Sequence, residues 1–150
     1  MEIINGERLV LGTCYYPEHW DESLWRDDLR RMLENGIEVI RIAEFAWSKI
    51  ERYEGVFNYD FFDRFLDVAA DMGMKVIFCT PTATPPAWLT EKYPEVLNAN
   101  MDGVLYRHGG RRHYNYNSPK YQELTRIIVE KSASHYAKHP AIIGWQIDNE

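Results

Sequence analysis

The sequence has few cysteines and no long apolar run. Cys14 and Cys79 are the only cysteines among 150 residues, too few for a disulfide-stapled scaffold or a four-cysteine zinc site. Both lie in apolar, strand-like stretches, so we expect buried free thiols, with a disulfide or a metal pair as the alternative. No segment approaches the roughly 20 apolar residues that a membrane-spanning helix needs. We therefore expect no membrane partner.

Basic charge is also sparse. Lysine and arginine number 17 against 23 aspartates and glutamates, which gives a formal net charge of −6. The one basic cluster, RHGGRRH at residues 107–113, is interrupted by glycines, whereas phosphate binding favours a continuous basic face. We expect no nucleic-acid partner. The first twelve residues show no basic region leading into an apolar stretch of signal-peptide length, and we expect a cytoplasmic protein.

Four strand-like runs alternate with three helical patterns. The runs cover residues 9–16, 37–43, 74–80 and 141–148, and most of their positions are apolar, as in strands buried on both faces of a parallel sheet. Amphipathic helices are predicted at about residues 21–35, at about 58–72, and from Ser118 onward with Pro119 in the first turn. This alternation predicts crossover units and a parallel α/β sheet.

Two α/β architectures fit this order: an open doubly wound sheet and a (β/α)8 barrel. A nucleotide-binding doubly wound fold usually has a glycine-rich turn after its first strand, but the turn here, YYPEHWDES, contains no glycine. Polar residues cluster after each predicted strand, and the longest connection (81–118) also follows one. Barrel enzymes carry their active sites at these strand ends. We predict an α/β protein with the first four β/α units of a (β/α)8 TIM barrel, since a whole barrel needs eight strands and about 250 residues.

Polar residues at the predicted strand ends are candidates for chemistry. Arg41 interrupts an apolar strand, and a buried guanidinium needs partners. It forms either a structural ion pair with Glu44 or Asp148, or a bond that holds an active-site carboxylate. Asn149 and Glu150 follow the fourth strand, where a carboxyl group with a raised pKa can donate a proton and an amide can hold a substrate hydroxyl. A solvated strand end is the alternative.

Aromatic residues indicate a substrate class. Many lie at or near the predicted strand ends: Tyr15, Tyr16, Trp20, Trp47, Trp88, Tyr114 and Trp145. Flat rings beside arginine, asparagine and glutamate suit sugars, which present flat C–H faces and rings of hydroxyl groups. Some of these rings belong to the core, and Trp145, inside a strand, is the first candidate.

Five motifs occur in order: CYYPEHW, RIAEFAWSKIE, TPTATPPAWL, RRHYNYNSP and GWQIDNE. Together they closely resemble the N-terminal half of the catalytic barrel of glycoside hydrolase family 42, the β-galactosidases of clan A, from about Gly12 to Glu150. The resemblance implies a (β/α)8 barrel followed by smaller domains, a homotrimer, no cofactor, and retaining hydrolysis of terminal β-D-galactose from β-galactosides or galacto-oligosaccharides. Two alternatives are another clan A retaining β-glycosidase, because the Asn-Glu pair is shared across the clan, and a non-catalytic carbohydrate-binding fragment.

The resemblance also implies roles for individual residues. Glu150 matches the general acid/base and Asn149 the residue that binds galactose near its reacting carbon. Arg112, the second arginine of GGRRHY, matches a galactose-binding arginine, and Arg41 and Glu44 match the segment that lines the base of the pocket. The nucleophile is a second glutamate from a later strand. We therefore expect residues 1–150 to be the N-terminal half of the catalytic domain, cut after the fourth strand and inactive alone.

One position departs from the pattern. Several family members bind zinc through four cysteines, the first of them directly after RRHY. This position is Asn115 here, so we expect no metal. In those members the zinc is structural and remote from the chemistry, so the departure does not affect the implied activity.

Overall fold

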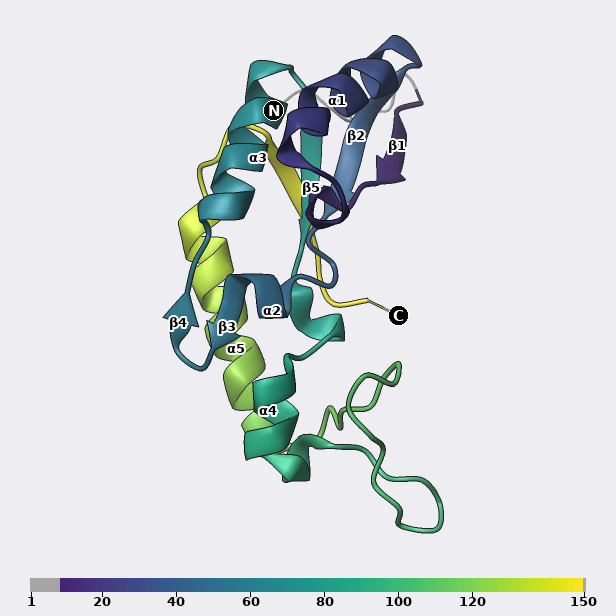
Figure 1. Ribbon diagram of the computed structural model, residues 1–150, viewed down its shortest axis with the longest axis vertical. Coiled ribbons are helices and arrows are strands. Elements are labelled where there is room, and N and C mark those ends of the chain that lie inside the picture. Colours follow the sequence, from purple (N-terminus) through teal and green to yellow (C-terminus); the bar gives the residue numbers. More distant parts are fainter. Residues whose placement is uncertain (1–8, 150) are drawn as a thin grey trace. The chain divides into compact units, whose positions relative to one another are not determined.

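The computed structural model describes residues 9–149 (Figure 1). They divide into two compact units, which we call the sheet unit (9–43, 59–79 and 136–147) and the loop unit (44–58, 80–135 and 148–149). Along the chain, each of three passages from the sheet unit to the loop unit follows a strand. The loop unit is therefore assembled from segments that begin where strands end.

The sheet unit contains four parallel strands. They are β1 (Leu11–Cys14), β2 (Ile37–Ile42), β5 (Lys75–Cys79) and β6 (Ile142–Gln146), and they pair in the order β1-β2-β5-β6. Each strand lies beside the next parallel strand of the sequence. A doubly wound sheet reverses its strand order at a switch point, whereas a barrel does not, so this order agrees with the predicted barrel units.

Two bulges interrupt the pairing of these strands. Val76 lies opposite Ile142 while Ile77 lies opposite Gly144, so β6 carries one extra residue, Ile143. The register also shifts where β1 meets β2, beside Gly12. A side chain on Gly12 would place its Cβ 3.0 Å from a backbone oxygen of β2, which explains the glycine at this close approach.

Two helices cover the sheet within this unit. Helix α1 (Trp25–Glu34) contacts β2, α3 (Asp60–Asp71) contacts β5, and the two helices contact each other. Their interface is aromatic: the rings of Trp25 and Phe65 meet edge to face at 5.1 Å. Both predicted helices exist, although the first opens with a short 3₁₀ turn (η2, Glu22–Leu24), at which the carboxylate of Asp21 accepts a bond from the backbone N–H of Ser23.

The burial of the strands differs from the prediction. The central strands β2 and β5 are largely buried, but all of β1 is exposed and β6 is half-buried. Among the described residues, β1 and β6 are the edges of the sheet, and an edge strand lacks a neighbour on one side. Cys79 is a buried free thiol as expected, whereas the prediction was wrong for Cys14, a free thiol that is exposed on edge strand β1.

The loop unit contains elements that the sequence reasoning missed. Helix α2 (Trp47–Ile50) leads into an antiparallel hairpin of β3 (Glu51–Tyr53) and β4 (Val56–Phe57), and the long connection contains α4 (Ala87–Lys92) with short 3₁₀ turns at Pro81–Ala83 and Pro94–Val96. Gly55 closes the hairpin with φ at +77°. The dipeptide Glu54-Gly55 between β-forming residues was the available signal. Helix α5 (Pro119–Tyr136) begins at the predicted cap.

The core of the loop unit contains aromatic rings and a buried carboxylate. Tyr114 stacks on Tyr121 at 4.8 Å, and the hydroxyl of Tyr121 donates to the carbonyl of Thr82 at 2.8 Å. Glu51 accepts bonds from the indole N–H of Trp47 and the backbone N–H of Gly55, each at 2.8 Å. The ring of Trp47 also lies 6.4 Å from that of Tyr121. These contacts together connect the hairpin, the segment after β5 and the start of α5.

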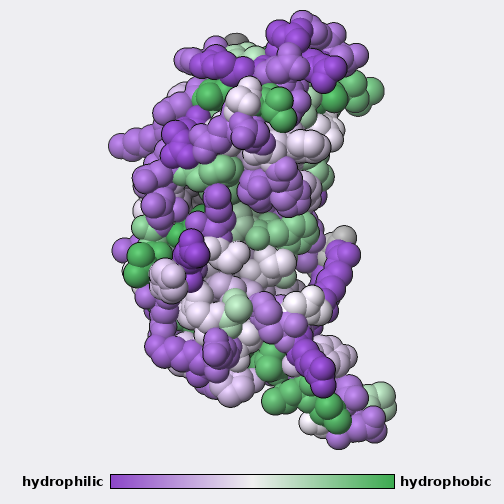
Figure 2. All heavy atoms as spheres, viewed as in Figure 1, coloured by the Kyte–Doolittle hydropathy of each residue, from purple (hydrophilic) through white to green (hydrophobic). Residues whose placement is uncertain are grey.

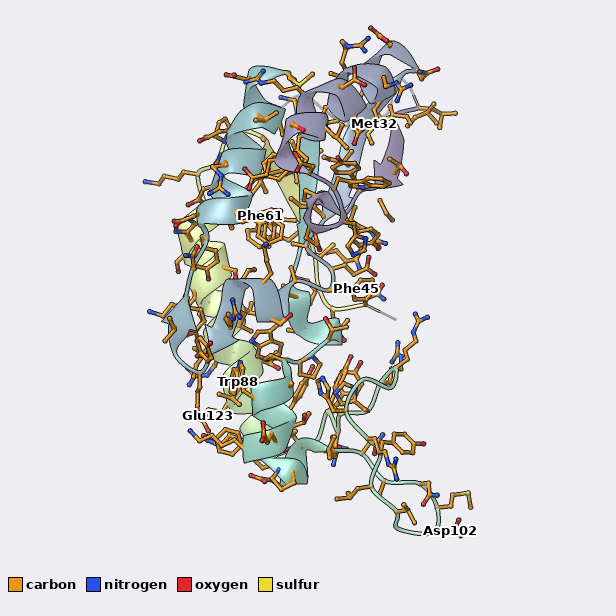
Figure 3. The ribbon with its side chains drawn as sticks, in the orientation of Figure 1. Met32, Phe45, Phe61, Trp88, Asp102 and Glu123 are labelled. Atoms are coloured by element: carbon orange, nitrogen blue, oxygen red, sulfur yellow. The ribbon has the colours of Figure 1, made fainter. Side chains whose placement is uncertain are left out.

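Part of the long connection forms an exposed loop. Ala99 and Leu105 pair as an antiparallel bridge, and Met101 between them is fully exposed. Apolar side chains gather over this loop at the lower right of Figure 2, and Asp102 lies at its tip (Figure 3). Over the described residues, none of the helices combines the length and apolarity that a membrane crossing requires.

Candidate active site

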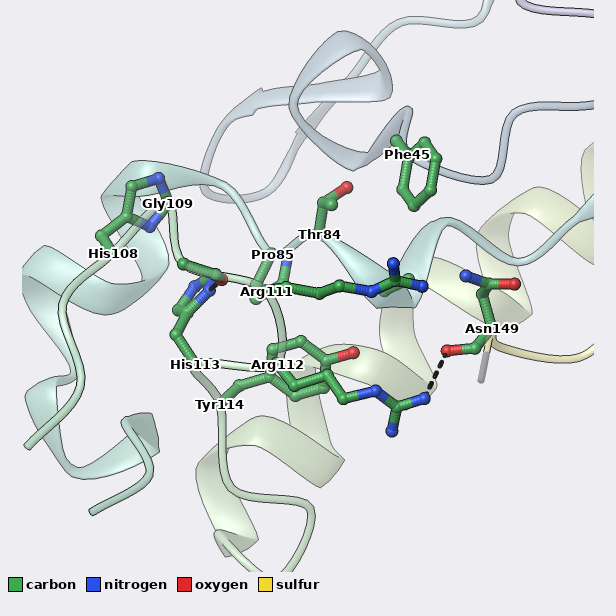
Figure 4. A pocket seen from close by; sticks show the side chains of 12 residues that line it. Phe45, Thr84, Pro85, His108, Gly109, Arg111, Arg112, His113, Tyr114 and Asn149 are labelled. Atoms are coloured by element: carbon green, nitrogen blue, oxygen red, sulfur yellow. Dashed lines mark hydrogen bonds between the residues drawn. The ribbon is translucent and has the colours of Figure 1, made fainter. Parts of the chain in front are cut away.

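A cavity of about 380 Å³ lies within the loop unit (Figure 4). Its lining comes from segments that follow three different strands, together with the end of the long connection: Phe45, then Ala83, Thr84 and Pro85, then 108–114, then Asn149. The volume is within the range of small-molecule sites. As predicted, the segments that follow β2, β5 and β6 come together, and they do so around this cavity.

Arg112 enters this cavity from a strained backbone. Its φ is +55°, in the left-handed region that residues with a Cβ rarely adopt. Its Nη2 donates to the backbone carbonyl of Asn149 at 3.3 Å, and its Nη1 donates to the hydroxyl of Tyr116 at 3.4 Å. Figure 4 shows the Arg111 and Arg112 side chains extending in the same direction, toward Asn149. Backbone strain of this kind is typical of residues held in place for function.

Asp148 connects the end of the fourth strand to the segment after β5. Its φ is +54°, and its backbone N–H donates to Thr80 Oγ1 at 2.7 Å. Its carboxylate accepts from the hydroxyl of Thr82 at 2.6 Å and from that of Tyr116 at 3.1 Å. The sequence reasoning treated Asp148 only as a partner for Arg41. The signals for this role were its position before Asn-Glu and the two threonines at and just after the end of the third predicted strand.

Three other predicted site residues follow β2 or β6 in the sequence. Glu150 is outside the described residues. Asn149 is half-buried and lines the cavity. Glu44 is buried at the first position of the loop unit. The proposed roles of all three stay predictions.

Arg41, on β2 of the sheet unit, bonds to side chains of two other strands. Its Nη1 donates to Gln146 Oε1 on β6, and its Nη2 lies 2.9 Å from the sulfur of Cys14 on β1. The guanidinium thus links β1, β2 and β6. Neither partner was anticipated, and the predicted bonds of Arg41 to carboxylates are not among these contacts.

Two histidines shape one wall of the cavity. His108 Nδ1 lies 2.9 Å from the hydroxyl of Thr90, and its ring meets that of His113 edge to face at 5.0 Å. His113 is buried and donates from Nδ1 to the carbonyl of Gly110. Burial, together with the nearby His113, lowers the pKa of His108. Near neutral pH this wall therefore carries an uncharged His108 ring.

Several of the predicted sugar platforms are core residues instead. Trp47 and Tyr15 are buried, and Tyr114 is 1% exposed, although it borders the cavity. Burial and the bond to Tyr116 raise the pKa of the Tyr114 hydroxyl. Phe45 is an exposed apolar ring on this cavity, with 41% of its surface accessible. It lies in the EFAW stretch, beside residues that the sequence reasoning did single out.

Metal ligands do not gather in the described residues. Across residues 9–149, no three histidine, cysteine, aspartate or glutamate side chains are arranged to hold a metal ion. Asn115, at the position of the zinc-binding cysteine in some family members, donates its backbone N–H to the carbonyl of Val96 at 2.8 Å. The expected absence of zinc stays a prediction.

Comparison with known proteins identifies the family. Residues 14–150 match the sequence model of Glyco_hydro_42, described as beta-galactosidase. A beta-galactosidase of a Thermus species is 47% identical over 141 residues, which are 94% of this chain and 22% of that protein. One of Halorubrum lacusprofundi is 44% identical over 140 residues, which are 93% of this chain and 20% of that protein.

Solved structures give the same answer. The crystal structure of beta-galactosidase from the psychrophilic Marinomonas ef1 superposes with a TM-score of 0.91 at 44% identity, over 95% of this chain and 22% of that one. The chain thus spans about a fifth of the length of its curated relatives. The fold is α/β, with the parallel β/α units of a TIM barrel. On this evidence the chain belongs to glycoside hydrolase family 42.

Proposed function

We propose that the protein carrying this chain is a retaining β-galactosidase that hydrolyses terminal β-D-galactose residues of β-galactosides and galacto-oligosaccharides. The observation that carries the proposal is the cavity that brings Arg112 and Asn149 together. The relatives of this chain are named beta-galactosidases, which supports the same substrate.

The cavity has groups suited to a sugar. A guanidinium presents a planar fork of N–H donors that can bond to two neighbouring hydroxyl groups, and Arg112 supplies one at the Asn149 end. The exposed ring of Phe45 offers an apolar face. Asn149 would bind galactose near its reacting carbon, and Arg41 and Glu44 would support the base of the pocket.

The proposed chemistry needs two carboxyl groups. In retaining hydrolysis they lie about 5–5.5 Å apart, one protonating the leaving oxygen and the other attacking the sugar. Glu150 would be the proton donor, because it directly follows Asn149. The nucleophile would be a second glutamate from a later strand, outside residues 1–150. The covalent galactosyl-enzyme would then react with water, with Glu150 acting as the base.

The place of this chain in the whole protein, and the location and assembly of that protein, are also proposals. We infer that residues 1–150 correspond to the N-terminal half of the catalytic barrel, since they match about a fifth of much longer relatives. The protein would be cytoplasmic and homotrimeric, act without a cofactor, and bind neither membrane nor nucleic acid.

The full-length protein tests the proposal. We expect it to cleave an aryl β-galactoside in preference to the matching β-glucoside and β-mannoside, and we expect NMR to show β-galactose as the first-formed product. Preference for another sugar would support a different clan A glycosidase, and α-galactose as the first product would contradict retention. Calorimetric binding of galactose without turnover of any glycoside would support a carbohydrate-binding protein instead.

A further inference from the structure

Hydrogen bonds and one peptide link join Arg112, Tyr116, Asp148 and Asn149 into a closed ring. Arg112 donates to the Tyr116 hydroxyl, Tyr116 donates to the Asp148 carboxylate, and the chain continues from Asp148 to Asn149. The carbonyl of Asn149 accepts from Arg112 and closes the ring. We propose that Asp148 is a positioning residue that holds the sugar-binding Arg112 and the Asn149-Glu150 pair in a fixed relation. The inference rests on the proposed function.

Asp148 is itself held from the segment after β5. The hydroxyl of Thr80 accepts from its backbone N–H at 2.7 Å, and the hydroxyl of Thr82 donates to its carboxylate at 2.6 Å. Both threonines are buried, so these bonds have little competition from water. They hold the backbone of Asp148 in its left-handed conformation, with φ at +54°. The direction in which the chain leaves Asp148 toward Asn149 is thereby set.

The second carboxylate oxygen of Asp148 contacts Tyr116, which in turn contacts the sugar-binding Arg112. It accepts from Tyr116 at 3.1 Å, which leaves the Tyr116 oxygen able to accept from Arg112 at 3.4 Å. A carboxylate at the end of such a chain strengthens the bonds before it. The negative charge of Asp148 therefore orients the Arg112 fork through Tyr116. One side chain thus acts on both the residue that binds the sugar and the backbone that carries the proton donor.

Asp148 thus has two sets of contacts, one to Thr80 and Thr82 and one through Tyr116 to Arg112, which we call its two arms. Breaking them should have different effects on the kinetics. Tyr116→Phe breaks the arm to Arg112 but leaves both threonine bonds of Asp148 in place. Its loss of kcat/KM should be the same for good and poor leaving groups, because Arg112 binds the sugar. Asp148→Asn removes the charge and one acceptor and so affects both arms. Its loss should be larger for poor leaving groups, which need protonation.

The experiment measures kcat and KM of the full-length protein with two aryl β-galactosides of different leaving-group pKa. For Asp148→Asn, kcat/KM should fall by roughly 10- to 100-fold, as for the loss of a bond to a charged group. Asparagine tolerates the left-handed backbone nearly as well as aspartate, so the variant should fold. The double variant should lose less than the product of the two single losses. Asp102→Asn and Tyr106→Phe, on the exposed loop of the same unit, are matched controls and should retain wild-type kinetics.

The outcomes separate the inference from the function. An active wild type with unchanged kcat/KM in both variants would overturn the positioning role alone. Equal losses on both substrates for Asp148→Asn, multiplying with those of Tyr116→Phe, would also overturn it, because they indicate a general loss of stability. If Asp148→Asn fails to fold, Tyr116→Phe decides by itself, because an unchanged kcat/KM would show that Asp148 does not orient Arg112 through Tyr116. A wild type that cleaves no glycoside would reject the proposed function, and the positioning role with it.

Discussion

Arg112 donates a hydrogen bond from Nη2 to the backbone carbonyl of Asn149 at 3.3 Å, across 37 positions of the sequence. The bond joins a side chain from the long connection to the backbone that follows the fourth parallel strand. It uses one arm of the guanidinium fork. The geometry of this arginine is therefore set by the protein before any ligand binds.

The first prediction is that lysine cannot replace Arg112. Arg112→Lys keeps the charge but loses the planar fork, because the three N–H groups of an ammonium diverge from one nitrogen and cannot reproduce two parallel bonds to neighbouring hydroxyl groups. We expect transition-state stabilisation to fall by about 2–4 kcal/mol, measured as kcat/KM of the full-length protein. Arg107→Lys, an exposed arginine in the same connection, is the matched control. An unchanged kcat/KM for Arg112→Lys would make Arg112 a surface residue of the loop.

The second prediction concerns Glu150. In the full-length protein, Glu150→Ala should lose much more activity on poor leaving groups than on activated aryl groups, which need no proton. Azide should partly restore turnover and yield a β-galactosyl azide, detected by NMR. Glu91→Ala, on the exposed side of α4, serves as the control. Equal losses on both substrates, without the azide product, would argue that Glu150 is not the acid/base.

The third prediction is a pH dependence set by Glu51. Burial raises the pKa of this carboxyl above its ordinary 4.5, despite bonds from Gly55 and Trp47. The folded state then holds its proton to higher pH than the unfolded state, so the stabilising contribution of Glu51 is present below pH 4.5 and is lost as pH rises through the raised pKa. The Tm of the wild type minus that of Glu51→Gln should therefore fall between about pH 4 and pH 7.

Glu54 provides a control of opposite sign. Bonds from Lys92 and Tyr93 lower the pKa of its carboxyl, so its contribution is present above its ordinary pKa and is lost on acidification. The Tm difference for Glu54→Gln should rise with pH between about pH 3 and pH 5. A Glu51 difference with the same slope as that of Glu54 would show that burial of Glu51 does not dominate.

The fourth prediction is self-association of the 150-residue chain on its own. In the described sheet, β1 and β6 each have a partner on one side, and unpaired strand edges are templates for other chains. We expect light scattering to give a mass above that of the monomer, and an aryl galactoside assay to detect no turnover. Ile147→Lys, at an exposed position after β6, should reduce the association. A monomer that turns over substrate would contradict both parts.

The sequence was sufficient for features governed by local rules. Gly36 ends α1 and Gly73 ends α3, because each adopts a positive φ that residues with a Cβ rarely adopt. The parallel order of the strands follows from the alternation of strands and helices. Burial of the strands could not be predicted in the same way, because Leu11 and Ile143 have similar hydropathy to residues of the central strands. Their exposure depends on which strands become edges, which is a property of the whole sheet.

In the candidate site, too, the sequence predicts what depends on local motifs but not the contacts between distant positions. Arg112 and Asn149 could be selected from motifs, because their residue types and neighbours are distinctive. The bonds of Asp148 to Thr82 and Tyr116 join positions 66 and 32 residues apart. No periodicity in the sequence reports such a contact. The platform roles of Trp47 and Tyr114 were overestimated for a related reason, since an aromatic ring near a strand end can turn inward as easily as outward.

The extra residue of β6, Ile143, shifts by one position the alternation of faces along the strand after it. Side chains alternate between the two faces of a strand, so Trp145, whose ring meets that of Phe78, and Gln146, which accepts from Arg41, belong to opposite faces. Removing Ile143 would leave Ile142 opposite Val76 and Gly144 opposite Ile77 in a regular ladder, so both side chains would keep their faces. Inserting one residue between Gly144 and Trp145 without a second bulge would exchange the faces, sending an amide toward the aromatic core and an indole toward the guanidinium. An added residue therefore changes β6 abruptly, whereas the exposed loop around Met101 can absorb it gradually. Insertions among proteins of this kind should concentrate in that loop and be excluded from this part of the strand.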